Sequence, residues 1–108
     1  MFVHSVYFWL KPDLTLEQRA AFFRGVRSLT TIETVRQSYV GEPAPTHRKV
    51  IDRSYSCALI IVFDDELGHD LYQVHPVHDR FREECSSFWS KVSIYDAVTT
   101  PEAESTGG

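Results

Sequence analysis

The segment Asp70-Leu-Tyr-Gln-Val-His-Pro-Val-His-Asp-Arg-Phe81 gathers an aromatic hydroxyl and two imidazoles around a single proline. Tyr72, His75 and His78 follow one another at intervals of three residues. Wherever the backbone is helical, this spacing places their side chains near one face, where they can share a pocket. The segment therefore predicts a change of local structure at the proline and a candidate site beside it.

The proline divides this region into two predicted helices. Pro76 lacks a backbone N–H and disfavours helical backbone at the residue before it, so we expect one helix to end near Gln73. Pro76 suits the first position of a second helix, which we predict to run to about Ser87. His78 then lies in a first turn, where the positive end of the helix disfavours protonation of its imidazole.

The flanking sequence alternates between strand and helix patterns. Thr15 and Gln18 have the spacing of a capping box, which predicts a helix to about Leu29 with an inward stripe of Leu16, Ala20, Phe23 and Val26. Strands are predicted over residues 2–10, 34–42, 56–63 and 89–98. This order is typical of an α+β protein with a ferredoxin-like split β-α-β topology and a four-stranded antiparallel sheet.

Both faces of the first predicted strand are largely apolar. His4, Phe8 and Leu10 share one face, whereas Tyr7 and Trp9 lie on the other. A strand with one solvated face would alternate cleanly between apolar and polar residues, so both faces should be covered. We predict that helices cover the first face and that a second copy of the sheet covers the other, which makes a homodimer.

Composition narrows the function classes. A chain of 108 residues with a hydrophobic fraction of 43% indicates one domain, which we assign to residues 1–98, followed by a polar tail over 99–108 that is predicted to be disordered. The net charge of −4 gives no electrostatic reason to bind nucleic acid or an anionic membrane. The apolar run over residues 57–63 suits a strand, no apolar stretch approaches the roughly 20 residues of a membrane span, and no leader pattern is present, so a cytoplasmic protein is expected. Cys57 and Cys85 are predicted to be free thiols.

Three elements of the sequence resemble one known family. They are a first strand that contains His4, the segment His75-Pro-Val-His78, and a closing Phe88-Trp-Ser-Lys-Val-Ser-Ile-Tyr-Asp96, in that order. The chain resembles the Dabb family, the stress-responsive dimeric A/B barrel proteins, from about Phe2 to Val98. The resemblance implies a dimeric α+β barrel. It implies an activity less directly, although a plant polyketide cyclase is a member.

The residues themselves place a candidate site between sheet and helices. His4 lies on the face that should meet the helices, so His4, Tyr72 and His78 are expected to converge in one apolar pocket. The resemblance to the plant cyclase implies that His78 is the general base, that Tyr72 orients a carbonyl or phenol, and that His4 supports the hydrogen-bond network. We predict further substrate contacts from His75, Phe8, Phe23 and Phe81. Bulky phenylalanines could also fill the cavity that a polyketide needs.

Each of these residues also has a purely structural interpretation. His75 can hold the helix break through a backbone hydrogen bond, His78 can satisfy a buried turn, and Tyr72 and His4 can be core residues. The histidines also raise the question of a metal, but the spacing of His69, His75, His78 and Asp79 matches no closed zinc signature. We therefore predict no metal site.

The favoured function is a cofactor-free enzyme of the cyclase or lyase type, which acts on a small aromatic or polyketide-like carbonyl compound with His78 as base. The alternative is a non-catalytic dimeric protein that binds a small molecule or takes part in a stress response. A third possibility, cofactor-free monooxygenase chemistry, rests on analogy of fold alone.

Overall fold

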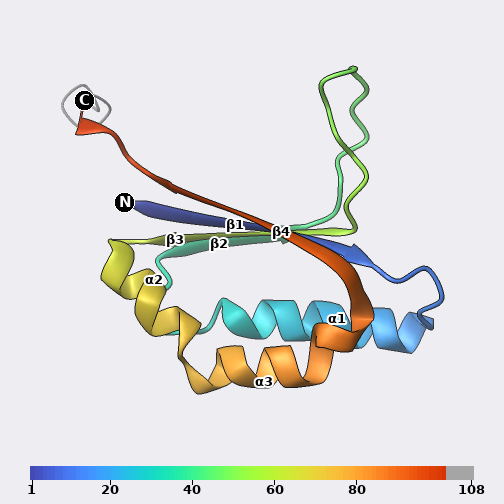
Figure 1. The fold of residues 1–108 in the computed structure, drawn as a ribbon, viewed down its shortest axis with the longest axis horizontal. Coiled ribbons are helices and arrows are strands. Elements are labelled where there is room, and N and C mark those ends of the chain that lie inside the picture. Colours follow the sequence, from blue (N-terminus) through green and yellow to red (C-terminus); the bar gives the residue numbers. More distant parts are fainter. Residues whose placement is uncertain (102–108) are drawn as a thin grey trace.

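Four strands form one antiparallel sheet with helices on a single face in the computed structural model, which describes residues 1–101 (Figure 1). The strands are β1 (Phe2–Leu10), β2 (Gln37–Gly41), β3 (Cys57–Phe63) and β4 (Trp89–Val98). The helices are α1 (Leu16–Leu29), α2 (Glu66–Gln73) and α3 (Pro76–Cys85), and a short 3-10 turn (Ser86–Phe88) precedes β4. The sheet order β2-β3-β1-β4 confirms the ferredoxin-like topology.

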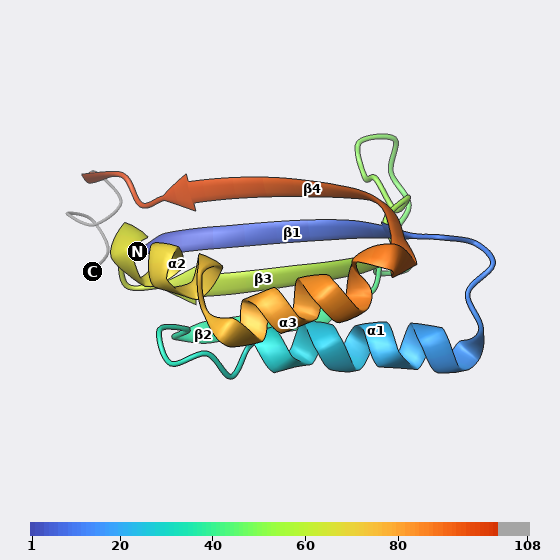
Figure 2. The same ribbon diagram turned by 60° about the horizontal axis from the view of Figure 1, so that its bottom comes forward.

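Side-chain caps begin α1 and α2, and the capping box of α1 is the predicted one. Thr15 and Gln18 form the reciprocal capping box of α1. Asp65 accepts a hydrogen bond from the backbone N–H of Gly68 at the start of α2. Pro76 occupies the first turn of α3, so the chain bends between the two short helices (Figure 2).

Two predicted boundaries are wrong at the level of a few residues. Strand β2 begins at Gln37 rather than at residue 34, because the backbone N–H of Val35 donates to Ile32 in a turn and the Thr34 hydroxyl donates to the carbonyl of Gly68. Helix α3 ends at Cys85, where the backbone tightens into the 3-10 turn. The predicted tail lies outside the described residues from residue 102 onward.

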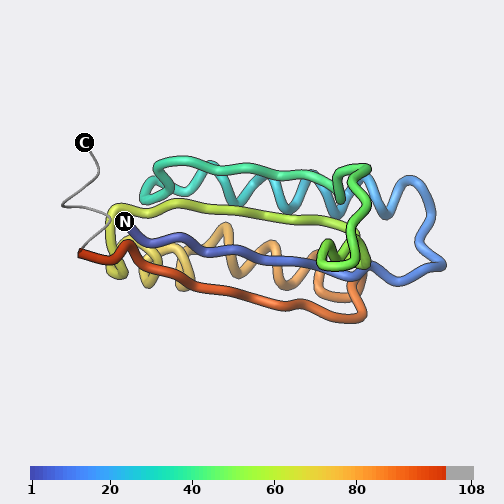
Figure 3. The backbone as a smooth tube through the Cα atoms, turned by 90° about the horizontal axis from the view of Figure 1, so that it is seen from above, coloured from blue at the N-terminus to red at the C-terminus, as the bar shows by residue number. Residues whose placement is uncertain are grey.

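The inward face of α1 also differs from the prediction. Its buried residues are Phe22, Val26 and Leu29, whereas Leu16 is 88% exposed. Seen from above, the first turn of α1 extends past the ends of the strands, so nothing covers the predicted start of the stripe (Figure 3). The orientation of α1 about its own axis places Phe22, rather than the predicted Phe23, in the buried core.

Helices α1 and α3 approach closely at Gly25. A Cβ atom added there would lie 2.6 Å from Sγ of Cys85 and 3.2 Å from the Phe81 ring, so packing accounts for this glycine. Both cysteines are buried and free, as predicted. Burial raises the pKa of the Cys57 thiol to about 12, which keeps it protonated and unreactive.

The face of the sheet away from the helices carries aromatic residues. The Tyr7 ring contacts those of Tyr55 and Tyr95, and Tyr39 and Tyr95 are 61% and 66% exposed. The connection over residues 42–56 rises from this same side (Figure 1). Among residues 1–101 no helix has the length and apolar character needed to cross a membrane.

Candidate active site

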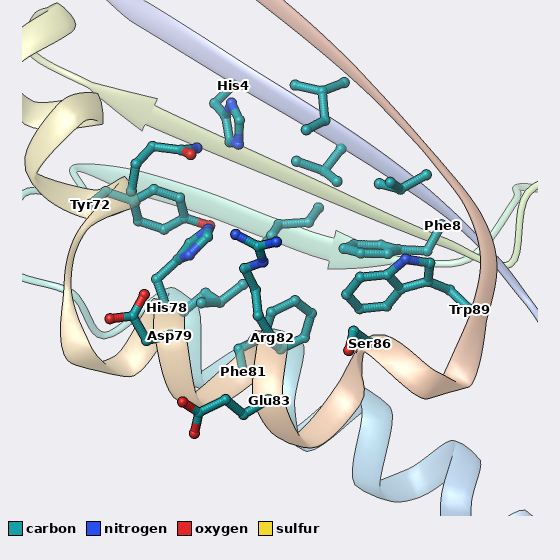
Figure 4. A pocket seen from close by; sticks show the side chains of 16 residues that line it. His4, Phe8, Tyr72, His78, Asp79, Phe81, Arg82, Glu83, Ser86 and Trp89 are labelled. Carbon is teal, nitrogen blue, oxygen red and sulfur yellow. The ribbon is translucent and has the colours of Figure 1, made fainter.

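A cavity of about 720 Å³ lies between the sheet and helices α2 and α3 (Figure 4). Strands β1 and β4 form its roof, the last turn of α2 forms one end, and α3 forms its floor. The predicted site residues on its walls are His4, Phe8, Tyr72, His78 and Phe81. The fold therefore brings together side chains that are up to 77 residues apart in the sequence, from His4 to Phe81.

His4 is a buried imidazole that is held by a carboxylate. Its Nδ1 atom lies 2.5 Å from Oδ1 of Asp96, the residue paired with it across β1 and β4. Burial lowers the pKa of His4 and outweighs the raising effect of the carboxylate, so the ring is neutral at pH 7. Because a carboxylate accepts, Nδ1 carries the proton and Nε2 is left as an acceptor.

Tyr72 lies between the two imidazoles. It is the penultimate residue of α2, and its ring centroid is 5.7 Å from that of His4 and 5.0 Å from that of His78. The side chain is buried, and this burial raises the pKa of its hydroxyl. The phenol therefore stays protonated and can donate a hydrogen bond at neutral pH.

His78 projects from the first turn of α3 toward Tyr72 (Figure 4). Its pKa is lowered, first by burial and next by the nearby cation of Arg82, so the ring is neutral at pH 7. Its Nδ1 atom is buried and has no hydrogen-bond partner among the described residues. Buried polar atoms are normally paired, so an unsatisfied ring nitrogen is unusual for a histidine with a purely structural role.

Two of the predicted substrate contacts lie away from the cavity. His75 caps α3: its Nδ1 atom accepts from the backbone N–H of Val77 at 3.1 Å, and Nε2 lies 3.2 Å from Glu33. Phe23 faces a separate groove beside β2, where the guanidinium groups of Arg19 and Arg27 lie over its ring. In the described structure neither side chain lines the wall formed by the other predicted site residues.

The remaining phenylalanines form a wall and leave the cavity open. The indole of Trp89 stacks on Phe81 with ring centroids 5.6 Å apart and packs against Phe8 at 5.1 Å. Val92 and Ile94 of β4 continue this apolar surface. The cavity therefore offers an aromatic and aliphatic wall opposite the proton-sharing groups.

Sequence reasoning did not place the charged residues in this site and considered Asp79 only as a metal ligand. Arg82, Asp79 and Glu83 all line the cavity. Arg82 follows His78 by four residues, a helical spacing that could have revealed it. Asp96 had no comparable local signal, because its contact with His4 depends on the register between two strands that are distant in sequence.

Among the described residues, one group has the composition of a metal site. The ligand atoms of His4, His69 and Asp96 all lie within 4.8 Å of one another. His69 is also within 3.3 Å of Gln73 and 3.2 Å of Asp70. This group differs from the four residues considered and set aside in the sequence, because His75 and His78 belong to other surroundings.

A helix-covered antiparallel sheet of order β2-β3-β1-β4 with an internal cavity defines a ferredoxin-like α+β domain with a candidate small-molecule site. The chain belongs to the Dabb family, since the model of the Stress responsive A/B Barrel Domain matches residues 2–99. The family expected from the sequence is therefore confirmed.

Named relatives include two enzymes. The olivetolic acid cyclase of Cannabis sativa is 26% identical over 94 residues, which cover 86% of this chain and 91% of that protein. The structure of a hydroxynitrile lyase from Passiflora edulis has a TM-score of 0.75 at 16% identity and covers 93% of this chain and 94% of its own.

Dimeric structures are also similar to this chain. A dimeric ferredoxin-like protein of unknown function from Thermobifida fusca has a TM-score of 0.73 at 17% identity and covers 91% of this chain and 90% of its own. Two other similar structures, from Bacteroides fragilis and a Jannaschia species, are likewise described as dimeric. At these identities the likeness establishes the fold.

Proposed function

We propose that the cavity is an active site that removes a proton from the carbon next to a carbonyl group, in a reaction of the cyclase or lyase type. The observation that carries the proposal is the unpaired, neutral imidazole of His78 beside a buried tyrosine in an open apolar cavity. The substrate is a small aromatic or polyketide-like carbonyl compound. The names of the two enzyme relatives, a cyclase and a lyase, agree with this class of reaction.

His78 acts as the general base. A neutral imidazole accepts a proton efficiently when its pKa lies near or below the working pH, and burial keeps this ring in its basic form. Its place in the first turn of α3, across from the roof of the cavity, leaves room for a substrate between base and sheet (Figure 4).

Tyr72 stabilises the oxygen that becomes negative when the proton leaves. Its protonated hydroxyl end points into the same region as the His78 ring, where it can donate to a carbonyl that turns into an enolate (Figure 4). His4, whose tautomer is set by Asp96, presents a second polar group above the tyrosine. These residues supply both acid and base, so the proposed reaction needs no cofactor.

The shape of the cavity supports an aromatic or extended apolar substrate. Phe8, Phe81 and Trp89 offer ring faces and edges on which an aromatic ring can stack. A volume of about 720 Å³ lies within the range of small-molecule sites.

Exchange of the methyl protons of acetophenone in D2O tests the proposal, because it follows proton abstraction without requiring the natural substrate. The wild type should accelerate exchange, and His78→Ala should lower that rate by roughly 100-fold or more. Tyr72→Phe should also slow it. His47→Ala, in the exposed 42–56 connection, is the matched control and should exchange like the wild type.

The alternatives give different results in the same experiments. If His78→Ala exchanges as fast as the wild type, His78 is not the base. A wild type without exchange activity whose melting temperature rises with aromatic ligands would favour a non-catalytic binding protein. Consumption of oxygen with phenols or quinols would instead indicate monooxygenase chemistry.

We also propose that the open face of the sheet binds a second copy of the chain. Its exposed tyrosines and the adjacent 42–56 connection form an aromatic surface that is unusual for a solvated sheet. The similar structures that are described as dimeric support the same arrangement. Two sheets packed face to face would complete the dimeric barrel that the family resemblance implies.

A further inference from the structure

Arg82 brings a positive charge to a cavity whose imidazole, phenol and aromatic groups are uncharged. It lies one helical turn after His78 on α3, and its guanidinium group points into the cavity between His78 and the aromatic wall (Figure 4). The two imidazoles on this cavity are neutral and the phenol is protonated. The guanidinium is therefore the charge that a ligand would meet beside the base.

Nearby carboxylates do not neutralise this cation. Within residues 1–101 the Arg82 guanidinium takes part in no ion pair, although Asp79 and Glu83 also line the cavity. The carboxylates of Asp79 and Glu83 are directed away from the guanidinium and the His78 ring (Figure 4). Asp96, the other nearby carboxylate, is within 2.5 Å of His4.

We propose that Arg82 binds a carboxylate of the substrate, which narrows the substrate class to aromatic or polyketide-like keto acids. A guanidinium offers a planar pair of donors that matches the two oxygens of a carboxylate, and such charge-assisted pairs are stronger than neutral hydrogen bonds. Arg82 is itself exposed to solvent, so the strength of this pair rests on the matched geometry and opposite charge of the two groups.

The position of Arg82 also fits the proposed reaction. This inference rests on that reaction only for the identity of the carbon that loses its proton. A carboxylate held by Arg82 would place the rest of the molecule between the His78 ring and the aromatic wall. Binding of an anion would offset the effect of Arg82 on His78 and make that imidazole a stronger base.

Binding of benzoylacetate and of the neutral benzoylacetamide, measured by calorimetry at pH 7.5, tests this site. The two compounds have the same aromatic β-keto skeleton and differ in the charged group. The wild type should bind benzoylacetate roughly tenfold to a hundredfold more tightly than the amide. Arg82→Gln should remove this preference and leave the affinity for the amide unchanged, and Arg82→Lys should retain part of it.

Arg80→Gln is the matched control, because Arg80 is an exposed arginine on the same helix that is not part of the cavity wall. It should keep the full preference for the acid. Equal wild-type affinities, no binding of benzoylacetate at millimolar concentration, or an unchanged preference in Arg82→Gln would each overturn the proposal. So would an equal loss in both arginine variants, which would indicate a general effect of protein charge.

Proton exchange of acetophenone separates this proposal from the proposed function, because acetophenone carries no carboxylate. A wild type that prefers the acid but does not exchange acetophenone would leave the Arg82 site intact and contradict the role of His78. A wild type that exchanges acetophenone and does not prefer the acid would contradict the role of Arg82 alone.

Discussion

Burial gives His4, Tyr72 and His78 the protonation states that acid–base chemistry near neutral pH requires. It lowers the pKa of both imidazoles and raises the pKa of the phenol. The two histidines differ in their partners: His4 donates to Asp96, whereas Nδ1 of His78 has no partner among the described residues. A structural histidine is normally satisfied by the protein, so the unpaired Nδ1 distinguishes His78 from His4.

The lowered pKa of His78 predicts how the stability of the protein depends on pH. Between the folded pKa and the ordinary value of 6.5, the unfolded chain binds a proton at His78 and the folded chain does not. The contribution of His78 to the free energy of unfolding should therefore be constant above about pH 6.5, where both states are neutral, and should fall as the pH decreases below it. His78→Gln should show a smaller fall over the same range.

Urea unfolding at a series of pH values measures this difference. His47→Gln, in the exposed 42–56 connection, serves as the control and should follow the wild type. If wild type and His78→Gln lose stability in parallel between pH 6.5 and pH 5, burial of a neutral His78 does not contribute to the acid sensitivity of the fold.

At the scale of secondary structure, the break between α2 and α3 positions the site. Helix α2 ends at Gln73 and α3 begins at Pro76, so Tyr72 and His78 belong to different helices whose axes change direction between them (Figure 2). His75 caps the second helix with its ring nitrogen. The bend, more than the spacing of three residues, brings the phenol against the imidazole.

His75→Ala should destabilise the protein by about 1 kcal/mol, because the first turn of α3 loses the acceptor for the Val77 N–H. His75→Asn should keep most of the stability, since an asparagine side chain can accept the same hydrogen bond. Urea unfolding measures both variants. Because His75 does not line the cavity, acetophenone exchange should be nearly unchanged in His75→Asn. A large loss of exchange in this stable variant would show that His75 takes part in the reaction.

At the scale of the whole molecule, the sheet has one covered face and one open face. Light scattering after gel filtration should give a mass near twice the 12.4 kDa of one chain. Tyr95→Glu should shift the protein toward the monomer, because the added charge would be buried without a partner between the two sheets.

Arg80→Gln, on the helical side of the molecule, should leave the mass unchanged and is the control for this experiment. A wild type that elutes as a monomer at micromolar concentration would contradict the proposed dimer. A Tyr95→Glu protein that remains fully dimeric would place the contact on another surface.

Local features of the sequence were sufficient to predict the order of the elements. The capping box at Thr15 and Gln18, the proline at position 76 and the apolar run of β3 each depend on neighbouring residues, and each is confirmed. The rotation of α1 was predicted incorrectly, because the apolar residues Leu16 and Phe23 fit a helical stripe equally well. The burial of Phe22 depends on which side of α1 packs against the sheet, and the helix sequence alone does not determine that side.

The sequence by itself determined the fold class, the break at Pro76 and the presence of His4, Tyr72 and His78 as candidate residues, because caps, prolines and apolar periodicity act over a few residues. Only the tertiary structure decided which partners these residues have. Asp96 meets His4 through strand register, and Arg82 enters the cavity through the packing of α3 under the sheet. Such contacts depend on the simultaneous packing of distant segments, which no local pattern contains.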